Sequence, residues 1–171
     1  QRCILNKAAI DALDAVLPAG VFLVGLTSVH WREAWKYGER AYRYCQHDVG
    51  HALGALCIAA AALGWRVALV SALSDSEVAG VLGVDRTTDF NDVEAEHPDL
   101  IATVITHPAS AVMPNLTKGL VAGVRASHWA GKANRLSPDY VDWAEIAAVE
   151  DATIKPHTAS LPQRDLAARS K

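Results

Sequence analysis

The chain has 171 residues, of which 51% are hydrophobic and 20% are charged, so it is long enough for one folded domain and too apolar for intrinsic disorder. Sixteen lysine and arginine residues against nineteen aspartate and glutamate residues give a net charge of −3, which argues against a dedicated nucleic-acid-binding protein. Three cysteines without a CxxC pair exclude a disulfide scaffold and predict reduced thiols in a cytoplasmic protein.

The first half of the chain predicts a helix, a strand and a second, longer helix. Residues 4–17 have amphipathic spacing and end at a Pro-Ala-Gly turn, which predicts the first helix. Residues 21–29 are rich in β-branched side chains and predict a buried strand. A polar and aromatic stretch follows over residues 30–44, and a long helix is predicted over residues 41–63.

The predicted helix over 41–63 carries a stripe of small side chains. They recur at spacings of four, three and four, and they are Gly50, Gly54, Cys57 and Ala61. Such a stripe lets the helix pack closely against another helix, in its own chain or across a two-fold axis. The apolar run over 52–65 has fourteen residues, fewer than the roughly 20 that span a bilayer, so we expect a buried helix and no membrane segment.

Beyond residue 65 the predicted elements are shorter. They are a strand over 66–71, a helix over 74–82, an exposed acidic loop over 85–98, a strand over 100–106, loops over 107–140 and a helix over 141–152. Ser74 and Glu77 have the spacing of a capping box at the start of their helix. Because strands and helices do not alternate as βαβ units, we expect an α+β fold with one domain over residues 1–155 and a frayed polar tail over 156–171.

His47 and His51 have the i, i+4 spacing of the paired histidines in zinc proteases. Asp48 replaces the glutamate base of that pattern, and no other histidine stands at a diagnostic spacing. The candidates for a third ligand are His30, His97, His107 and His128. A hydrogen-bonded structural pair is therefore favoured and no metal ion is expected, while a zinc hydrolase stays an alternative.

Lys36 and Tyr37 place two acid/base groups side by side. Such a pair can serve proton abstraction, whereas the competing interpretation is an exposed basic turn paired with Glu33 and Glu39. The sequence contains no G-x-S-x-G, Walker A or G-x-G-x-x-G motif, so serine hydrolase, P-loop and Rossmann interpretations have no support.

Two stretches of sequence resemble a known family. The run WREAWKYGERAYRYCQHDVGHAL (31–53), followed by AAALGW (60–65), resembles the SagB-type dehydrogenase branch of the FMN-dependent nitroreductase superfamily. The stretch GKANRLSPDYVDW (131–143) resembles the carboxyl-terminal part of the same group, so the resemblance covers about residues 20–155. It implies a mainly antiparallel sheet, a long central helix at a homodimer interface, and FMN held between two subunits.

The resemblance also implies a function and a set of site residues. Relatives are FMN-dependent dehydrogenases or nitroreductases that act on small molecules or, in azoline oxidation, on a modified peptide beside a cyclodehydratase partner. Lys36 and Tyr37 match the pair taken to handle the proton in azoline-oxidising relatives. The cofactor-binding residues that carry over are Lys132 and Arg135 as phosphate contacts, and Ser71 and Ala72 as backbone contacts near the flavin ring.

One part of the family pattern is absent from this sequence. Relatives carry an Arg- and Ser-containing phosphate clamp on their first helices, and only about twenty residues precede the first predicted strand here. Three explanations stay open: the chain is a fragment, another segment or subunit completes the site, or flavin binding has been lost. The last explanation makes a flavin-free interaction or scaffold subunit with the same fold the alternative function.

Overall fold

The computed structural model describes residues 2–91, 93–107, 116–133, 135 and 141–159. Its elements in chain order are β1 (Arg2–Ile4), α1 (Lys7–Val16), β2 (Val21–Ser28), α2 (His30–Tyr37), η1 (Gly38–Arg40), α3 (Ala41–Ala62), β3 (Arg66–Leu69), α4 (Asp75–Leu82), η2 (Thr87–Phe90), β4 (His97–Ile105), α5 (Lys118–Arg125), β5 (His128–Ala130) and α6 (Ala144–Thr153). Mixed helices and antiparallel strands confirm the predicted α+β fold. In the described part of the chain, no helix is long and apolar enough to cross a membrane.

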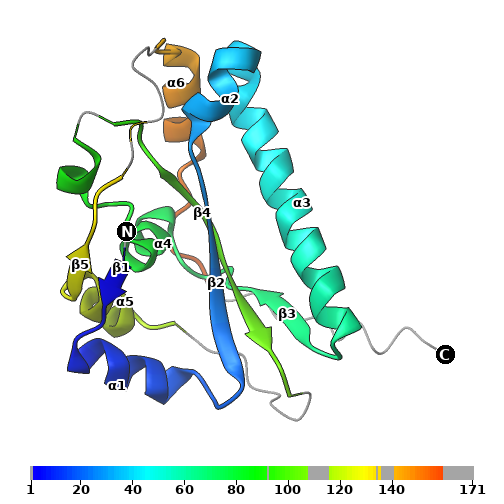
Figure 1. The fold of residues 1–171 in the computed structure, drawn as a ribbon, viewed down its shortest axis with the longest axis vertical. Helices are drawn as coiled ribbons and strands as arrows, with labels where there is room; N and C mark the ends of the chain where they lie inside the picture. Colours follow the sequence, from blue (N-terminus) through cyan, green and yellow to red (C-terminus); the bar gives the residue numbers. More distant parts are fainter. Residues whose placement is uncertain (1, 92, 108–115, 134, 136–140, 160–171) are drawn as a thin grey trace.

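A three-stranded antiparallel sheet with the order β2-β4-β3 lies at the centre (Figure 1). β4 is the middle strand, with a neighbouring strand on each side, and its residues 101–105 are all buried. The helices α1, α4 and α5 lie on one side of this sheet, and the long helix α3 runs along the other side (Figure 1). A separate two-stranded ribbon pairs β1 with β5.

The face of the sheet toward α1, α4 and α5 carries the main core. Its fully buried members are Ala9, Leu73, Val78, Ile101, Leu116, Leu120 and Val124. A side chain at Gly25 on β2 would collide with Leu82 of α4, so the odd-numbered residues of β2 point into this core. Gly83 ends α4 in the left-handed conformation, with a φ of 75°, and Trp129 fills the space that a Cβ would take.

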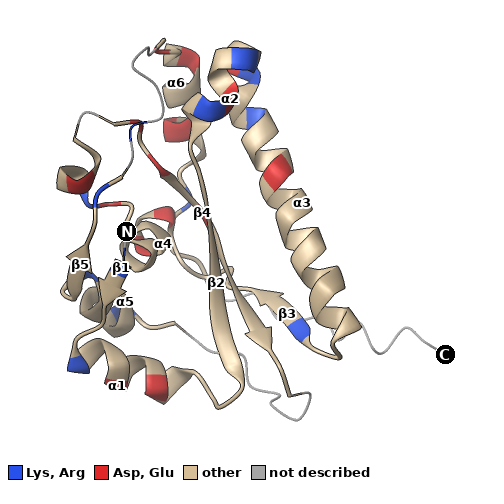
Figure 2. Ribbon diagram, viewed as in Figure 1, with Lys and Arg blue, Asp and Glu red and all other residues tan. Residues whose placement is uncertain are grey.

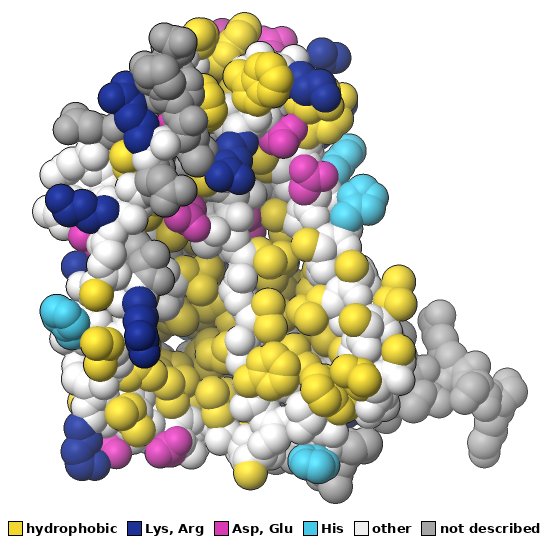
Figure 3. Space-filling view, viewed as in Figure 1, with side chains coloured by type: hydrophobic (Ala, Val, Ile, Leu, Met, Phe, Trp, Pro, Cys, Tyr) yellow, Lys and Arg dark blue, Asp and Glu magenta, His cyan; other side chains and the backbone are white. Residues whose placement is uncertain are grey.

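The opposite face of the sheet is apolar and only partly covered. Phe22 and Val67 flank Val104 in the register, which places all three on the side of α3. Phe22 is 43% exposed, and Leu69 on the same face is 48% exposed. Trp65 meets the Phe22 ring edge-on at 6.3 Å. Figure 3 shows hydrophobic side chains spread over this side of the molecule.

The long predicted helix is confirmed as α3, but its apolar second half does not enter a core within one chain. Ile58 is 74% exposed, and Leu63, just past the end of the helix, is 62% exposed. An added Cβ at Gly50 or Gly54 would meet no atom within 4 Å. The small-residue stripe therefore faces open space in the single chain.

Three stretches differ from the sequence-based predictions. Residues 30–40 belong to the polar and aromatic stretch for which no element was predicted, and they form α2 and η1, while the loop prediction over 107–140 missed α5 and β5. The acidic stretch 85–98 is not simply an exposed loop, because η2 lies in it and β4 begins at His97. The core-facing side of α5 packs against α1, and β5 needs β1 as a partner, so neither element is visible from local spacing alone.

The segment after α6 does not fray from residue 155 as predicted. The backbone N–H of Lys155 donates to Asp75 Oδ2 at 2.8 Å, and its Nζ donates to the Leu73 carbonyl at 2.6 Å. His157 Nδ1 lies 2.7 Å from Glu77 Oε2. These contacts tie residues 155–158 to α4, while residues 160–171 lie outside the described part of the chain.

Candidate functional site

Lys36 and Tyr37 are the last two residues of α2, where the chain turns into η1 and α3. Gly38 ends α2 with a φ of 59°, and a Cβ there would lie 3.1 Å from the Trp143 ring. A glycine is needed at this turn because it combines a left-handed backbone with close packing. The Lys36 ammonium lies 5.1 Å from the centre of the Tyr37 ring.

Aromatic and basic side chains continue from Tyr37 along the first turns of α3. The Tyr37 and Tyr44 rings lie 4.3 Å apart, Arg43 sits 5.7 Å from the Tyr44 ring, and His47 meets Tyr44 edge-on at 6.5 Å. We call Lys36, Tyr37, Arg43, Tyr44 and His47 the α2–α3 cluster. Its phenols and bases lie next to one another, and Lys36 is open to solvent. The cluster has the groups for proton transfer, but one chain alone does not exclude water from it.

The histidine pair on α3 is exposed and bonded to the backbone. His51 Nδ1 lies 2.8 Å from the His47 carbonyl, so this nitrogen donates a proton to the main chain. Among the described residues, no third histidine, cysteine or carboxylate joins the pair in a metal-binding group. The contact agrees with the structural interpretation and gives a zinc hydrolase at this place no support.

The predicted flavin-ring contacts, Ser71 and Ala72, lie under the segment that follows α6. Ala72 is buried and Ser71 is half-buried. Thr158 donates its backbone N–H to the Ala72 carbonyl at 2.9 Å and its hydroxyl to the Ser71 carbonyl at 3.2 Å. Residues 155–158 therefore occupy backbone acceptors of this loop.

The predicted phosphate contacts are both exposed, and Lys132 lines a hollow. This hollow has a volume of about 530 Å³, and Arg32 of α2 lines it as well. The two cations suit the phosphate end of a flavin. Glu94 and Glu96 line the same space and weaken its positive potential, although Thr27 donates a hydrogen bond to Glu96.

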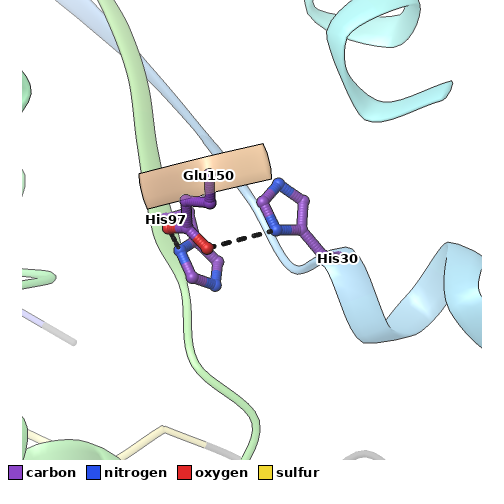
Figure 4. Close-up of side chains that lie close together, drawn as sticks. All are labelled: His30, His97 and Glu150. Atoms are coloured by element: carbon purple, nitrogen blue, oxygen red, sulfur yellow. Dashed lines mark ion pairs between the residues drawn. The ribbon is translucent and has the colours of Figure 1, made fainter. Parts of the chain in front are cut away.

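A second group of polar side chains lies where α2, β4 and α6 meet (Figure 4). It consists of His30, the first residue of α2, His97, the first residue of β4, and Glu150 of α6. The imidazole rings of His30 and His97 stack at 4.4 Å with 15° between their planes. His97 Nδ1 pairs with Glu150 Oε1, and His30 Nδ1 lies 3.9 Å from Glu150 Oε2.

His30 is the most deeply buried member of this group. It is 5% exposed, and its Nδ1 has no hydrogen-bond partner. Burial, reinforced by the neighbouring His97, lowers the pKa of His30 to about 4, so its ring is neutral near pH 7. Tyr42 closes the other side, with its ring centre 5.3 Å away.

Two further buried groups lie near the ends of β2 and β4. Burial raises the pKa of Asp99, whose carboxylate accepts a 2.7 Å hydrogen bond from Ser28. Burial also raises the pKa of Cys45 to about 11, with the negative charges of Glu33 and Asp99 adding to the effect. All three cysteines are free, and the Cys45 thiol is protonated at neutral pH.

Sequence reasoning named His30 and His97 only as remote partners for the α3 pair, and it missed Glu150. The three residues stand at positions 30, 97 and 150, and no spacing rule links such positions. Only the antiparallel pairing of β2 with β4 brings the two histidines together, because Ser28 pairs with His97.

Comparison with known proteins gives one family. Searches of the curated proteins and of the solved structures found no match. A scan of family models matched the region from α1 to the residues just after η2, which contains the Lys36–Tyr37 pair and all of α3. Residues 11–93, just under half of the chain, thus match the model of the nitroreductase family.

Proposed function

We propose that this chain is an FMN-dependent oxidoreductase of the nitroreductase type, related to the SagB-type dehydrogenases and active as a homodimer. The observation that carries the proposal is the nitroreductase family match over residues 11–93. That region contains Lys36 and Tyr37, and the structure joins them to Tyr44 on α3 in one cluster. Members of this family typically use a flavin.

The proposed dimer partner is a second copy of the chain, packed along α3. Residues 49–62 of α3 contain no lysine, arginine, aspartate or glutamate, and Figure 2 shows the charges of the helix confined to its first half. Gly50 and Gly54 face open space, so another backbone can approach them closely. A two-fold interface would cover the exposed Ile58 and Leu63 in both subunits.

The chemistry divides between the cofactor and the chain. A bound flavin supplies a two-electron acceptor for a hydride. Oxidation of an azoline ring also releases a proton, and the contact between Lys36 and Tyr37 supports the proposal that one of them receives or relays it. Because Lys36 is exposed in one chain, exclusion of water from it depends on the second subunit and the bound substrate.

Residues for cofactor binding are assigned from the hollow and from the resemblance. Lys132 and Arg32 would hold the phosphate end, and Arg135 would contribute from the same segment as Lys132. Ser71 and Ala72 remain proposed backbone contacts, although Thr158 already bonds to their carbonyl groups. The contacts to test are therefore those that the backbone N–H groups of Ser71 and Ala72 would make with the flavin.

The proposed substrate is a small molecule or an azoline-containing peptide made by a cyclodehydratase partner. The α2–α3 cluster supports a bulky substrate, because its Lys36 end is open at the surface. We place the reaction in the cytoplasm, in keeping with the three free cysteines.

The proposal is tested with the purified chain, its flavin absorption spectrum and turnover of an azoline peptide. Lys36→Ala and Tyr37→Phe should each lower turnover about 10²- to 10⁴-fold, the usual cost of losing a general acid or base, with the flavin spectrum intact. Lys7→Ala is the matched control, since Lys7 is an exposed lysine that pairs with Asp11 on α1.

Two results would contradict the proposal. Full turnover in both variants with flavin bound removes Lys36 and Tyr37 from the chemistry. A chain that binds no flavin under any reconstitution condition points instead to the flavin-free interaction subunit.

A further inference from the structure

The His30–His97–Glu150 group has features that its hydrogen bonds do not explain. Two imidazoles and one carboxylate converge from three separate elements, and their ligand atoms all lie within 4.8 Å of one another. His30 Nδ1 is buried without a hydrogen-bond partner, yet it faces the Glu150 carboxylate (Figure 4). Leaving a buried polar atom without a partner is unfavourable, so a ligand bound at this nitrogen would give a physical reason for its position.

We propose that His30, His97 and Glu150 bind a divalent cation of the zinc class. Two neutral imidazole nitrogens and one carboxylate oxygen form a donor set that zinc prefers, and three protein ligands leave a fourth position open for water. This proposal departs from the sequence-based expectation of no metal ion. It is independent of the α3 pair of histidines, which lacks a third ligand among the described residues.

The distances require an adjustment on both sides of Glu150, because His97 Nδ1 and Glu150 Oε1 are in direct contact and have to move apart, while His30 Nδ1 and Glu150 Oε2 have to approach. Zinc–ligand bonds of about 2.0–2.2 Å in a tetrahedral site place ligand atoms about 3.4 Å apart. His30 Nδ1 and Glu150 Oε2 are 3.9 Å apart, so they need to approach by roughly half an ångström. Glu150 can make this movement because its side chain is 31% exposed, whereas His30, at 6%, is fixed by packing.

The surroundings favour a cation over an anion. Hollows of about 170 Å³ and 200 Å³ are both lined by His30, His97 and Glu150. The carboxyl groups that also line them are Glu94, Asp142, Asp75 and Asp99. The basic side chain there is Lys155, and its ammonium is held by backbone carbonyls of Leu73 and Pro156. The hollows beside the group thus have room for a water ligand, and the carboxyl groups that line them favour a cation.

A bound cation would connect α6 to the starts of α2 and β4. Glu150 lies 120 positions from His30 in the sequence, and Trp143, the residue before α6, makes no side-chain capping hydrogen bond. Binding to the folded chain alone would raise its stability with the logarithm of the ratio of metal concentration to dissociation constant. The same ion would fix the start of α2, which ends at Lys36 and Tyr37.

The test is metal binding to the full chain, with Zn²⁺ in equilibrium dialysis and Co²⁺ as a spectroscopic probe. We expect one equivalent of Zn²⁺ per chain, a rise in melting temperature with Zn²⁺, and visible Co²⁺ absorption of a four- or five-coordinate site. Glu150→Gln and His97→Asn should weaken binding by about 100-fold or more, because losing even a group that only supports a ligand costs about 10- to 100-fold.

Two controls separate this site from adventitious binding. His157→Gln alters a different histidine–glutamate pair, which His157 forms with Glu77. Because this pair is separate from the proposed site, Zn²⁺ binding should not change. The double variant His47→Gln and His51→Gln removes the exposed pair on α3 and should also leave binding unchanged. Glu150→Gln is the main variant because it keeps the shape of a half-exposed residue, whereas removal of buried His30 would disturb folding as well.

Either of two outcomes overturns the proposal. One is the absence of stoichiometric Zn²⁺ binding by a folded chain prepared without chelators. The other is binding that survives in Glu150→Gln and His97→Asn. Loss of binding in the α3 double variant alone would assign the metal to His47 and His51 instead.

Discussion

The two faces of the three-stranded sheet differ in how completely the chain covers them. On the side of α1, α4 and α5, Leu120 and Ile101 are almost inaccessible to solvent. On the side of α3, Phe22 and Leu69 keep nearly half of their surface, and Ile58 on the helix is largely exposed. Both sides are apolar, so the contrast lies in packing and not in composition.

This difference shows that the chain has more apolar surface than its own core uses. On the side of α1, α4 and α5, the helices pack closely. For example, a Cβ added at Gly123 of α5 would lie 3.1 Å from Ala9 Cα of α1. The glycines of α3 have nothing near them. A large exposed apolar patch generally marks a site of association. The packed side therefore maintains the fold, and we propose the α3 side as the subunit interface.

The largest expected contrast comes from shortening one aliphatic side chain on each side. Leu120→Ala should lower the free energy of unfolding by about 2–5 kcal/mol, because it leaves a cavity in a fully buried place. Ile58→Ala should change it by about 0.5 kcal/mol or less within a single chain. Urea unfolding at several protein concentrations, extrapolated to dilute protein, measures both values without the contribution of association. Equal losses would show that α3 is packed within its own chain.

A glycine substitution tests how tightly the packed side is closed. Gly123→Val should destabilise the fold by about 1–3 kcal/mol, because the new side chain has to displace the backbone of α1 at Ala9. Gly119→Val on the same helix is the control, since its nearest neighbour is the Thr117 hydroxyl at an ordinary 3.7 Å. Thermal unfolding of both variants should separate them. Similar melting temperatures would mean that α1 and α5 can move apart at little cost.

Acid should weaken the packed side through Glu77. The hydrogen bond from the Ser74 backbone N–H, followed by the contact with His157, lowers the pKa of Glu77 to about 2. Since the folded pKa lies below the ordinary value of 4.5, this stabilisation is present above about pH 4.5 and is lost as the pH falls toward 2. Glu77→Gln should cost about 1 kcal/mol at pH 7 and flatten the stability profile between pH 4.5 and 2. Denaturant unfolding across this range checks it, and an unchanged acid profile in the variant would contradict the assignment.

Sequence patterns predicted the elements that depend on residues close together in the sequence. The spacing of Ser74 and Glu77 identified the start of α4, and the structure contains both hydrogen bonds of the capping box. The stripe of small residues over 41–63 lies on the predicted long helix, which the structure contains as α3. β5 escaped prediction because its three residues form a strand only by pairing with β1, more than a hundred positions away.

Of the two candidate groups, only the one made of sequence neighbours could be predicted from the sequence, because the other depends on long-range pairing. Lys36 and Tyr37 are adjacent in sequence, so their pairing was visible at once. The group of His30, His97 and Glu150 exists only after β2 has paired with β4 and α6 has packed near α2. Likewise, the apolar composition of the second half of α3 predicts burial, because an all-apolar helix is normally buried within its own chain. The structure shows this half exposed instead.

The central claim is that α3 forms a subunit interface, and sedimentation equilibrium of the whole chain tests it directly. The proposed arrangement predicts twice the single-chain mass of 18.3 kDa. Gly54→Leu should return the mass to that of one chain without unfolding it, because the added side chain meets open space in the monomer and a second backbone in the dimer. A folded wild-type chain that stays monomeric at high concentration with FMN present would contradict the claim.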